Sequence, residues 1–498
     1  MMQHLPILPV LLPALFAVLL LLQPQQASVK FRRIGSVLAM LLNLFVATAL
    51  LWQQTNVPAS HYLLGNWPEP FGILLVADQL SALFVWLTTL LTLAVAVYSC
   101  AGDDEKGAYF HPLLQFLLMG LNGAFLTGDL FNLFVFFEVL LIASYGLLVH
   151  GGGKKRIHSA LHYVVLNLVG SALFLLALAL LYAMLGSLHM TDMATRISAL
   201  TPAETLGVKA AAGLLLIVFG LKAALLPLHF WLPAAYSQAS APVAAVFAVM
   251  TKVGVYSLLR VFGLMFGASA GVLTGYGDAL LWWGGLLTML LAAAMLLAAV
   301  DLKKLAAALV LLSAGTLLAA LGSGNAQVKA AALYYAVHSS WIGAIWYLLS
   351  DLIARQRGSV GDRLVPGPRL PQATLLGWLF VFSALVVIGM PPFSGFVAKL
   401  WLIQGLTTTS HGMLLIGMLL LSSLAVLVAF SRAGSVLFWR AQPPVATAVQ
   451  TVVDAERTPV FAIALLLLAG VQLVIFGQWW TQFCADAIAQ LTAVSGGY

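Results

Sequence analysis

Long apolar runs alternate with short polar segments along the whole chain. Each run holds about 17–31 residues with few charges, enough for an α-helix to cross the ~30 Å hydrocarbon layer of a bilayer. The runs are continuous rather than ~10-residue alternations, so they predict spanning helices and not barrel strands. The predicted spans are 5–22, 34–52, 71–98, 111–127, 130–149, 159–185, 206–228, 240–266, 279–299, 304–321, 329–350, 373–403, 411–439 and 458–480.

The fold class predicted from this pattern is an all-α polytopic membrane protein with about fourteen transmembrane helices. Composition agrees: 62% of residues are hydrophobic and 8% are charged, whereas about a quarter are charged in soluble domains. The first span lacks a basic n-region and a cleavage site, so we expect it to be retained. Two cysteines give no disulfide framework, metal site or cofactor site, and we expect none.

Basic residues lie mainly on one side of the predicted topology. The loops after odd-numbered spans hold sixteen Lys and Arg residues, and those after even-numbered spans hold three. By the positive-inside rule, both termini are expected outside, in the periplasm of a bacterial cell inner membrane. The net charge of +7 therefore reflects membrane orientation, and we expect no nucleic-acid partner.

Two spans, the seventh and the twelfth, look interrupted. Pro227 and Pro233 follow Lys222 in one, and Pro391 and Pro392 precede Lys399 in the other. Proline unwinds or kinks a helix, and paired broken helices indicate an internal repeat around a transport pathway. The offset of five spans favours two inverted five-helix repeats. The predicted division is 1–110 (three N-terminal helices), 111–266 (first repeat), 279–439 (second repeat) and 458–480 with the tail to 498.

Ionisable side chains at mid-span carry the functional prediction. Glu138, Lys222, Lys252 and Lys399 lie deep in apolar spans, and His338 is a fifth candidate. An unpaired charge at the bilayer centre costs about 2.5–3.5 kcal/mol, so pairing or neutralisation is required. Burial favours the neutral forms, which makes each group a candidate two-state proton carrier. The alternative is a static ion pair between Glu138 and a lysine that fixes helix packing.

Weaker candidates follow from spacing. His229 lies two turns after Lys222 and shares its face if the helix continues through Pro227. Tyr256, one turn after Lys252, is a possible hydrogen-bond partner. Asp129 either leads protons toward Glu138 or caps that helix. Arg260, near a helix end, is expected to extend its charge to the interface.

These residues lie in segments that resemble a known family. The segments GAFLTGDLFNLFVFFEVLLIASYGLL, GLKAALLPLHFWLPAAY, AVMTKVGVYSLLRVF, LYYAVHSS and GMPPFSGFVAKLW occur in that order. Together they resemble the antiporter-like subunits shared by respiratory complex I and the Mrp-type (Mnh, Sha, Pha) multisubunit cation/proton antiporters. The likeness is greatest to the Mrp D subunit, since WLPAAY has Ala234 where complex I relatives usually carry an acid.

The resemblance implies roles for these positions. Glu138 corresponds to the family's fifth-helix glutamate and Lys222 to the lysine that pairs with it. Lys252, His338 and Lys399 correspond to the eighth-, eleventh- and twelfth-helix positions of a central polar axis. The implied fold has fourteen helices with two inverted repeats, and the implied partners are other membrane subunits of A, B, C, E, F and G type.

The expected function is therefore a subunit of a secondary antiporter, not an enzyme, that exchanges a monovalent cation, sodium by expectation, for protons. Glu138 and Lys222 would form a switchable ion pair that signals to Lys252, His338 and Lys399. Two alternatives stay open: a proton-pumping membrane subunit of a redox complex, such as complex I or a membrane-bound hydrogenase, and a structural membrane scaffold.

Overall fold

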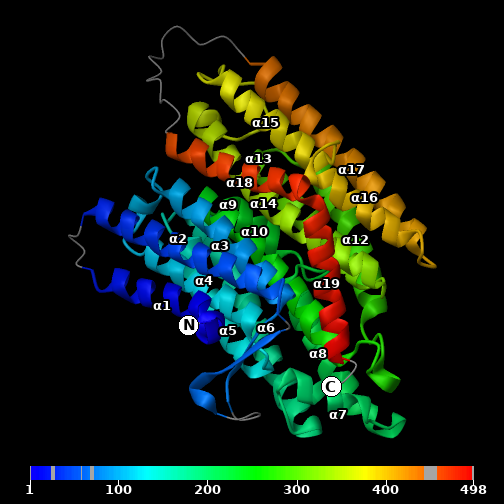
Figure 1. The fold of residues 1–498 in the computed structure, drawn as a ribbon. Coiled ribbons are helices and arrows are strands. Elements are labelled where there is room, and N and C mark those ends of the chain that lie inside the picture. The colour runs from blue at the N-terminus through cyan, green and yellow to red at the C-terminus, as the bar shows by residue number, and fades with distance from the viewer. Residues whose placement is uncertain (1, 24–27, 58, 68–71, 442–456, 496–498) are drawn as a thin grey trace.

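The computed structural model describes residues 2–23, 28–57, 59–67, 72–441 and 457–495, and the chain is helical almost throughout (Figure 1). The N-terminal α-helices are α1 (Leu8–Leu21), α2 (Val29–Gln54), α3 (Gln79–Ser99), α4 (Phe110–Leu126), α5 (Leu130–Val149), α6 (Lys154–Leu185), α7 (Met190–Ser198), α8 (Thr205–Lys222) and α9 (Trp231–Gln238). The remaining ones are α10 (Ala241–Ser257), α11 (Gly263–Met265), α12 (Asp278–Ala298), α13 (Leu302–Leu321), α14 (Ala326–Gln356), α15 (Ala373–Ile388), α16 (Ser394–Leu406), α17 (Gly412–Gly434), α18 (Arg457–Ile475) and α19 (Gly477–Ser495).

Membrane-crossing capacity agrees with the predicted fold class. Eleven helical segments of the described residues are long and apolar enough to cross a membrane, and α4 and α15 are apolar but shorter. Every predicted span overlaps a helix or a broken helix pair. The count of fourteen spans and the division into two repeats stay predictions.

Helix starts are fixed by short polar side chains. Asp78, Asp129, Asp301 and Asn325 are the N-caps of α3, α5, α13 and α14, and each accepts a hydrogen bond from a backbone N–H of the first turn. Such caps satisfy amides that have no partner within the helix. These four residues therefore set where α3, α5, α13 and α14 begin, and two of these helices carry Glu138 and His338.

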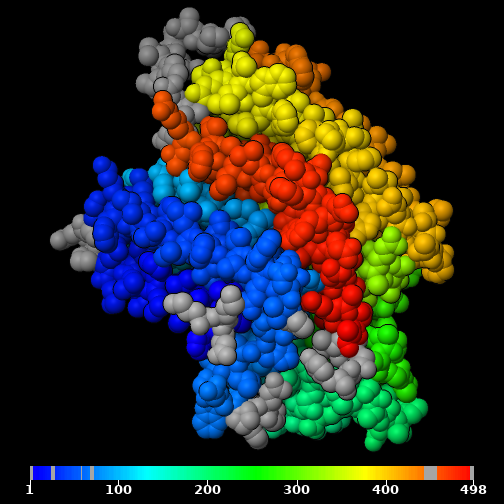
Figure 2. All heavy atoms as spheres, in the orientation of Figure 1, coloured from blue at the N-terminus to red at the C-terminus, as the bar shows by residue number. Residues whose placement is uncertain are grey.

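Burial separates central helices from peripheral ones. The apolar stretch around α10 is fully buried and that of α13 is 94% buried, whereas those of α1 and α18 are each 33% buried. α10 packs against α3, α8, α13 and α14, and α18 and α19 lie across the surface between the N-terminal helices and α15–α17 (Figures 1 and 2). Groups on α10, α13 and α14 are consequently shielded from lipid by protein.

Both predicted interruptions are found. α8 ends at Lys222, and non-helical residues 223–230 connect it to α9. α15 ends at Ile388, and residues 389–393, with Gly389 at φ +88°, connect it to α16. Each break exposes helix-terminal carbonyl groups inside the molecule, where they need partners other than water.

Three features were not predicted from the sequence. Strands β1 (Ser60–Leu63) and β2 (Leu74–Ala77) pair antiparallel, so a strand precedes the helix of the third predicted span, which starts only at Gln79. The loop after α6 contains α7. Beyond α18, α19 packs against α3 and α14 where only a tail was expected.

Candidate functional site

The first candidate group joins α5, α6 and α8. Glu138 lies in the middle of α5 and accepts a short hydrogen bond from the Ser171 hydroxyl of α6. Lys222, the last residue of α8, donates to the Asn167 side-chain oxygen at 2.8 Å. Asn167 and Ser171 are one turn apart on α6, so they face the same way. The polar connection between the carboxylate and the ammonium group therefore runs over α6.

Glu138 and Lys222, expected to form a switchable ion pair, do not contact each other directly in this structure. In the described part of the chain, Glu138 and Lys222 form no ion pair with each other, because each is bonded to α6 instead. The Lys222 ammonium lies 5.8 Å from the centre of the Phe137 ring, which adds a cation–π contact beside the carboxylate. The two charges still interact across this short polar bridge, in surroundings of low dielectric constant.

The second candidate group begins at Lys252 on α10. Its side chain is fully buried, and its ammonium donates to the Ser313 hydroxyl of α13 at 2.6 Å. The predicted partner Tyr256 bonds elsewhere: its hydroxyl donates to the Phe125 carbonyl and accepts from Arg260. Lys252 is thus held by a neutral hydroxyl on the neighbouring helix.

His338 and Lys399 meet the second helix break. Nδ1 of His338, on α14, and the Ser394 hydroxyl at the start of α16 lie 2.9 Å apart in a hydrogen bond. The Lys399 ammonium donates to the Ile388 carbonyl at 2.8 Å and to the Ser423 hydroxyl at 2.9 Å. Ile388 ends α15, so the lysine satisfies a carbonyl that the break leaves without a helical partner.

A small cavity lies beside His338 and Lys399. Its volume is about 20 Å³, and its lining includes Ser313, Thr316, His338, Ser339 and Lys399. That volume is enough for one water molecule, which needs two to four polar partners. Ser313 is the partner of Lys252, so the cavity lies beside His338, Lys399 and the hydroxyl that holds Lys252.

The weaker candidates take different positions. Asp129 accepts from the Asn132 amide at 2.9 Å and caps α5, while burial raises its pKa above the ordinary value. His229 lies in the break after α8, so the helix does not continue through Pro227 and the condition for a face shared with Lys222 is not met. Its Nδ1 is buried without a hydrogen-bond partner among the described residues.

The sequence prediction for Arg260 was also wrong. Its side chain does not extend to the interface but is buried, and it donates to both Asp78 carboxylate oxygens at 2.5 and 2.7 Å. It also donates twice to the Tyr256 hydroxyl, at 3.0 and 3.1 Å. The partners are 182 residues apart in sequence, so no local pattern could have found this cluster.

The face with the basic loops carries a network of ion pairs. Arg33 donates to both oxygens of Asp104 at 2.7 Å, and Arg355 pairs with Asp103 at 2.7 Å. Burial alone would raise the pKa of Asp104, but hydrogen bonds from Arg33 and His111 hold it well below the ordinary value. The Asp104 carboxylate therefore stays ionised at any physiological pH.

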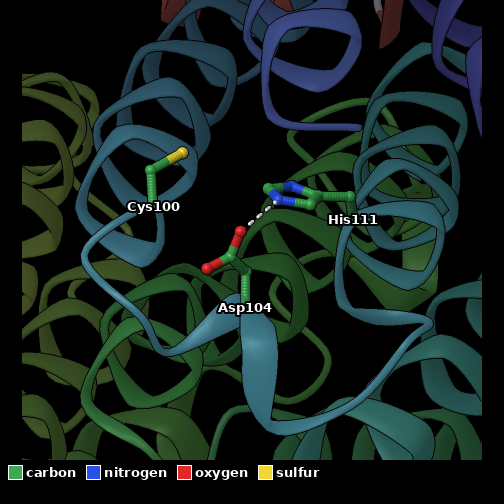
Figure 3. Close-up of side chains that lie close together, drawn as sticks. All are labelled: Cys100, Asp104 and His111. Carbon is green, nitrogen blue, oxygen red and sulfur yellow. Dashed lines mark hydrogen bonds and ion pairs between the residues drawn. The ribbon is translucent and has the colours of Figure 1, made fainter. Parts of the chain in front are cut away.

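Within that network, three possible metal ligands meet. Figure 3 shows Cys100 at the end of α3, Asp104 in the following turn and His111 at the start of α4 facing one another. Burial raises the pKa of the Cys100 thiol to about 11, which keeps it protonated. Arg33 already engages both Asp104 oxygens. The arrangement is that of an ion-pair cluster rather than a cation site.

The sequence of this chain matches a known protein family. The family model described as NADH:quinone oxidoreductase/Mrp antiporter, transmembrane, matches residues 127–426. The chain belongs to this family. All seven candidate residues, from Asp129 to Lys399, lie within the matched region.

Relatives within the family are antiporter subunits by name. The chain is 41% identical over 495 residues to the D subunit of a probable K⁺/H⁺ antiporter of Rhizobium meliloti, covering 92% of this chain and 90% of the relative. It is 36% identical over 443 residues to the D subunit of the Na⁺/H⁺ antiporter of Bacillus subtilis, covering 88% and 87%.

Solved structures show the same fold. A chain of the Mrp complex from Dietzia sp. superposes with a TM-score of 0.87 at 24% identity, covering 98% of this chain and 97% of that one. A chain of respiratory complex I from Thermus thermophilus gives a TM-score of 0.82 at 23% identity, covering 99% and 100%. The architecture is thus common to antiporter and redox complexes.

Proposed function

We propose that this chain is the D-type subunit of a multisubunit monovalent cation/proton antiporter of a bacterial cell membrane. Its partners are then the other membrane subunits, of A, B, C, E, F and G type. The names of the relatives at 36–41% identity support this assignment. One relative is named for K⁺ and the other for Na⁺. We expect sodium to be the exchanged ion, and the transport assay below uses both cations.

The observation that carries the proposal is the succession of buried ionisable groups from α5 to α16. Glu138, Lys222, Lys252, His338 and Lys399 are each bonded to a neutral hydroxyl, amide or carbonyl group on a neighbouring segment. In the described chain none of the five is locked in a direct ion pair with an opposite charge. A buried charge held by neutral partners can change its protonation state without breaking a salt bridge.

In this mechanism Glu138 and Lys222 communicate over Asn167 and Ser171. When Glu138 takes up a proton or a cation, the ammonium of Lys222 loses a nearby negative charge and releases its own proton more readily. Lys252, His338 and Lys399 extend the relay through the small polar cavity. Asp129 and His229 are proposed as peripheral members, at the mouth of α5 and at the first break.

The proposal is tested in everted membrane vesicles that contain the whole complex. Glu138→Ala and Lys222→Ala are each expected to reduce Na⁺- or K⁺-driven proton exchange at least about ten-fold, because a proton-transferring side chain typically contributes about 10²–10⁴-fold to the rate. Assembly is checked by co-purification of the other subunits. Wild-type exchange from normally assembled variants would refute the relay.

The alternative, a proton-pumping subunit of a redox complex, shares its fold with the chain of complex I. It predicts co-purification with iron–sulfur and quinone-site subunits instead of small hydrophobic ones. Proton exchange that is driven by a cation gradient and needs no electron donor would support the antiporter and exclude the redox-driven pump.

A further inference from the structure

A hollow of about 210 Å³ lies on the face opposite the basic loops. It is bounded by the start of α12, the end of α13, the start of α14, the π-helical turn Leu258–Phe262 and α19. Asp278 and Lys329 are the charged side chains of the described residues that line it. None of the relay groups lies in this hollow.

The structure keeps the Asp278 carboxylate open to the hollow. One of its oxygens lies 3.3 Å from where a side chain at Gly275 would begin and 3.7 Å from the corresponding position at Gly324. Both glycines have left-handed φ values, +71° and +67°, which other residues adopt with strain. In the described chain the carboxylate accepts no hydrogen bond and forms no ion pair with Lys329.

An aspartate in the first turn of a helix commonly does no more than interact with the helix dipole. That role needs neither a hollow nor glycines on two separate loops beside the carboxylate. The combination instead resembles a solvent-side binding position, and Lys329 across the hollow limits how tightly a cation is held. Weak binding is what a conducting entrance requires, because the ion must leave again.

Three helices lead from this hollow to the second relay group. Lys252 on α10 is followed by Leu259 in the π-helical turn that continues this helix. The other pairs of positions are Leu321 and Ser313 on α13, and Lys329 and His338 on α14. Their separations of seven to nine residues correspond to about 10–14 Å along a helix. The independent helices agree, so the hollow lies about that far from the relay toward the outer face.

We propose that this hollow is the outer-face ion entrance, and that Asp278 binds the monovalent cation, either a proton or an alkali ion, that passes between the outer solution and the Lys252–His338 group. The inference rests on the proposed antiport function. It adds the position at which ions meet the protein on the side opposite the basic loops.

Transport kinetics test the binding role. With the whole complex in proteoliposomes, Asp278→Asn is expected to raise the apparent KM of the ion on the outer face about three- to ten-fold, because local attraction of the cation is lost. The maximal rate should change little. The matched control is Asp192→Asn, an exposed carboxylate on α7 that pairs with Arg196 outside the hollow. Titrating Na⁺ at fixed pH, K⁺ at fixed pH, and pH at fixed cation separates an alkali-ion site from a proton site.

Accessibility gives a second readout that does not depend on the rate. In a Cys100→Ser, Cys484→Ala background, Asp278→Cys should react with a membrane-impermeant methanethiosulfonate added to the outer face of intact cells. A sulfonate adduct should lower the KM toward wild type, and a trimethylammonium adduct should raise it.

Unchanged KM values for all ions, or no labelling from outside, would overturn the inference. If Glu138→Ala abolishes exchange while Asp278→Asn does not alter it, the antiport proposal stands and only the entrance falls.

Discussion

Arg260 and Lys252 are both buried cations, but their hydrogen-bond partners differ in number and in charge. Arg260 uses all three guanidinium nitrogens, in two hydrogen bonds to the Asp78 carboxylate and two to the Tyr256 hydroxyl. Lys252, two turns away on the same continuous helical stretch, has one partner, the Ser313 hydroxyl. An ammonium group has three donors. Arg260 therefore uses four of its five N–H donors and faces an opposite charge, whereas Lys252 is held by a single neutral partner.

Lys399 lies between these extremes. Its ammonium is bonded to two carbonyls and a hydroxyl, so its donors are used, but every partner is neutral. Partner count and partner charge therefore rank the three cations from structural to exchangeable. Replacing each cation with methionine, which has a similar shape and no charge, tests that ranking.

The largest loss of stability is expected for Arg260→Met. It leaves the buried Asp78 carboxylate without its counter-charge, and breaking a buried pair in this way costs about 3–5 kcal/mol. Thermal unfolding of the purified complex measures the loss. The double variant with Asp78→Asn should recover part of it, since asparagine keeps the cap of α3 and carries no charge. If Arg260→Met were as stable as the wild type, Arg260 would not be a structural cation distinct from Lys252.

Lys399→Met should have an intermediate effect. It leaves the Ile388 carbonyl at the end of α15 without a partner, and an unsatisfied buried acceptor costs about 1–3 kcal/mol. Exchange activity should also fall. Ser423→Ala is the matched control, because that hydroxyl also donates to the Leu419 carbonyl and its removal takes away one of three acceptors. Equal losses from both variants would show that the break does not depend on the lysine.

Much of this architecture could be predicted from the sequence because bilayer physics leaves a plain signal. Apolar runs of spanning length, prolines within them and ionisable residues at their centres gave the helices, both breaks and the deep charges. The helix α19 was missed because it is less apolar than the spans before it. Strand β2 was missed because its residues continue the apolar run into α3.

The bonding partners could not be predicted. Asn167 and Ser171 stand singly in an apolar helix, where each looks like an ordinary interhelical hydrogen bonder. That α6 presents both to Glu138 and Lys222 depends on tertiary packing. Similarly, pairing Arg260 with Asp78 requires knowing that α3 and the π-helical turn after α10 meet.

Lys252→Met should change stability little while removing exchange. Burying an ammonium group is costly, and Ser313 keeps a partner because its hydroxyl donates to the Val310 carbonyl. We expect a stability change below about 1 kcal/mol and at least a ten-fold loss of exchange. Ser313→Ala serves as the control that removes the partner but keeps the charge, and it should retain part of the activity. A large loss of stability in Lys252→Met would place this lysine in the structural class with Arg260.

The smallest effect is expected at the face with the basic loops, where a neutral base contacts the paired charges. His150 shares a hydrogen bond of 2.8 Å with the Asp103 carbonyl, and Lys106 and Arg156 are the neighbouring cations. Burial lowers its pKa below the ordinary 6.5, against the opposing effect of the Asp103 carbonyl. A lowered histidine pKa contributes stability that is complete above the unfolded value and is lost as pH falls through the folded value.

Thermal unfolding between about pH 5 and pH 8 should therefore show stability decreasing on the acid side. His150→Gln, which keeps a donor but does not titrate, should flatten that slope. An unchanged slope would assign the acid sensitivity to another group and leave His150 as a packing residue.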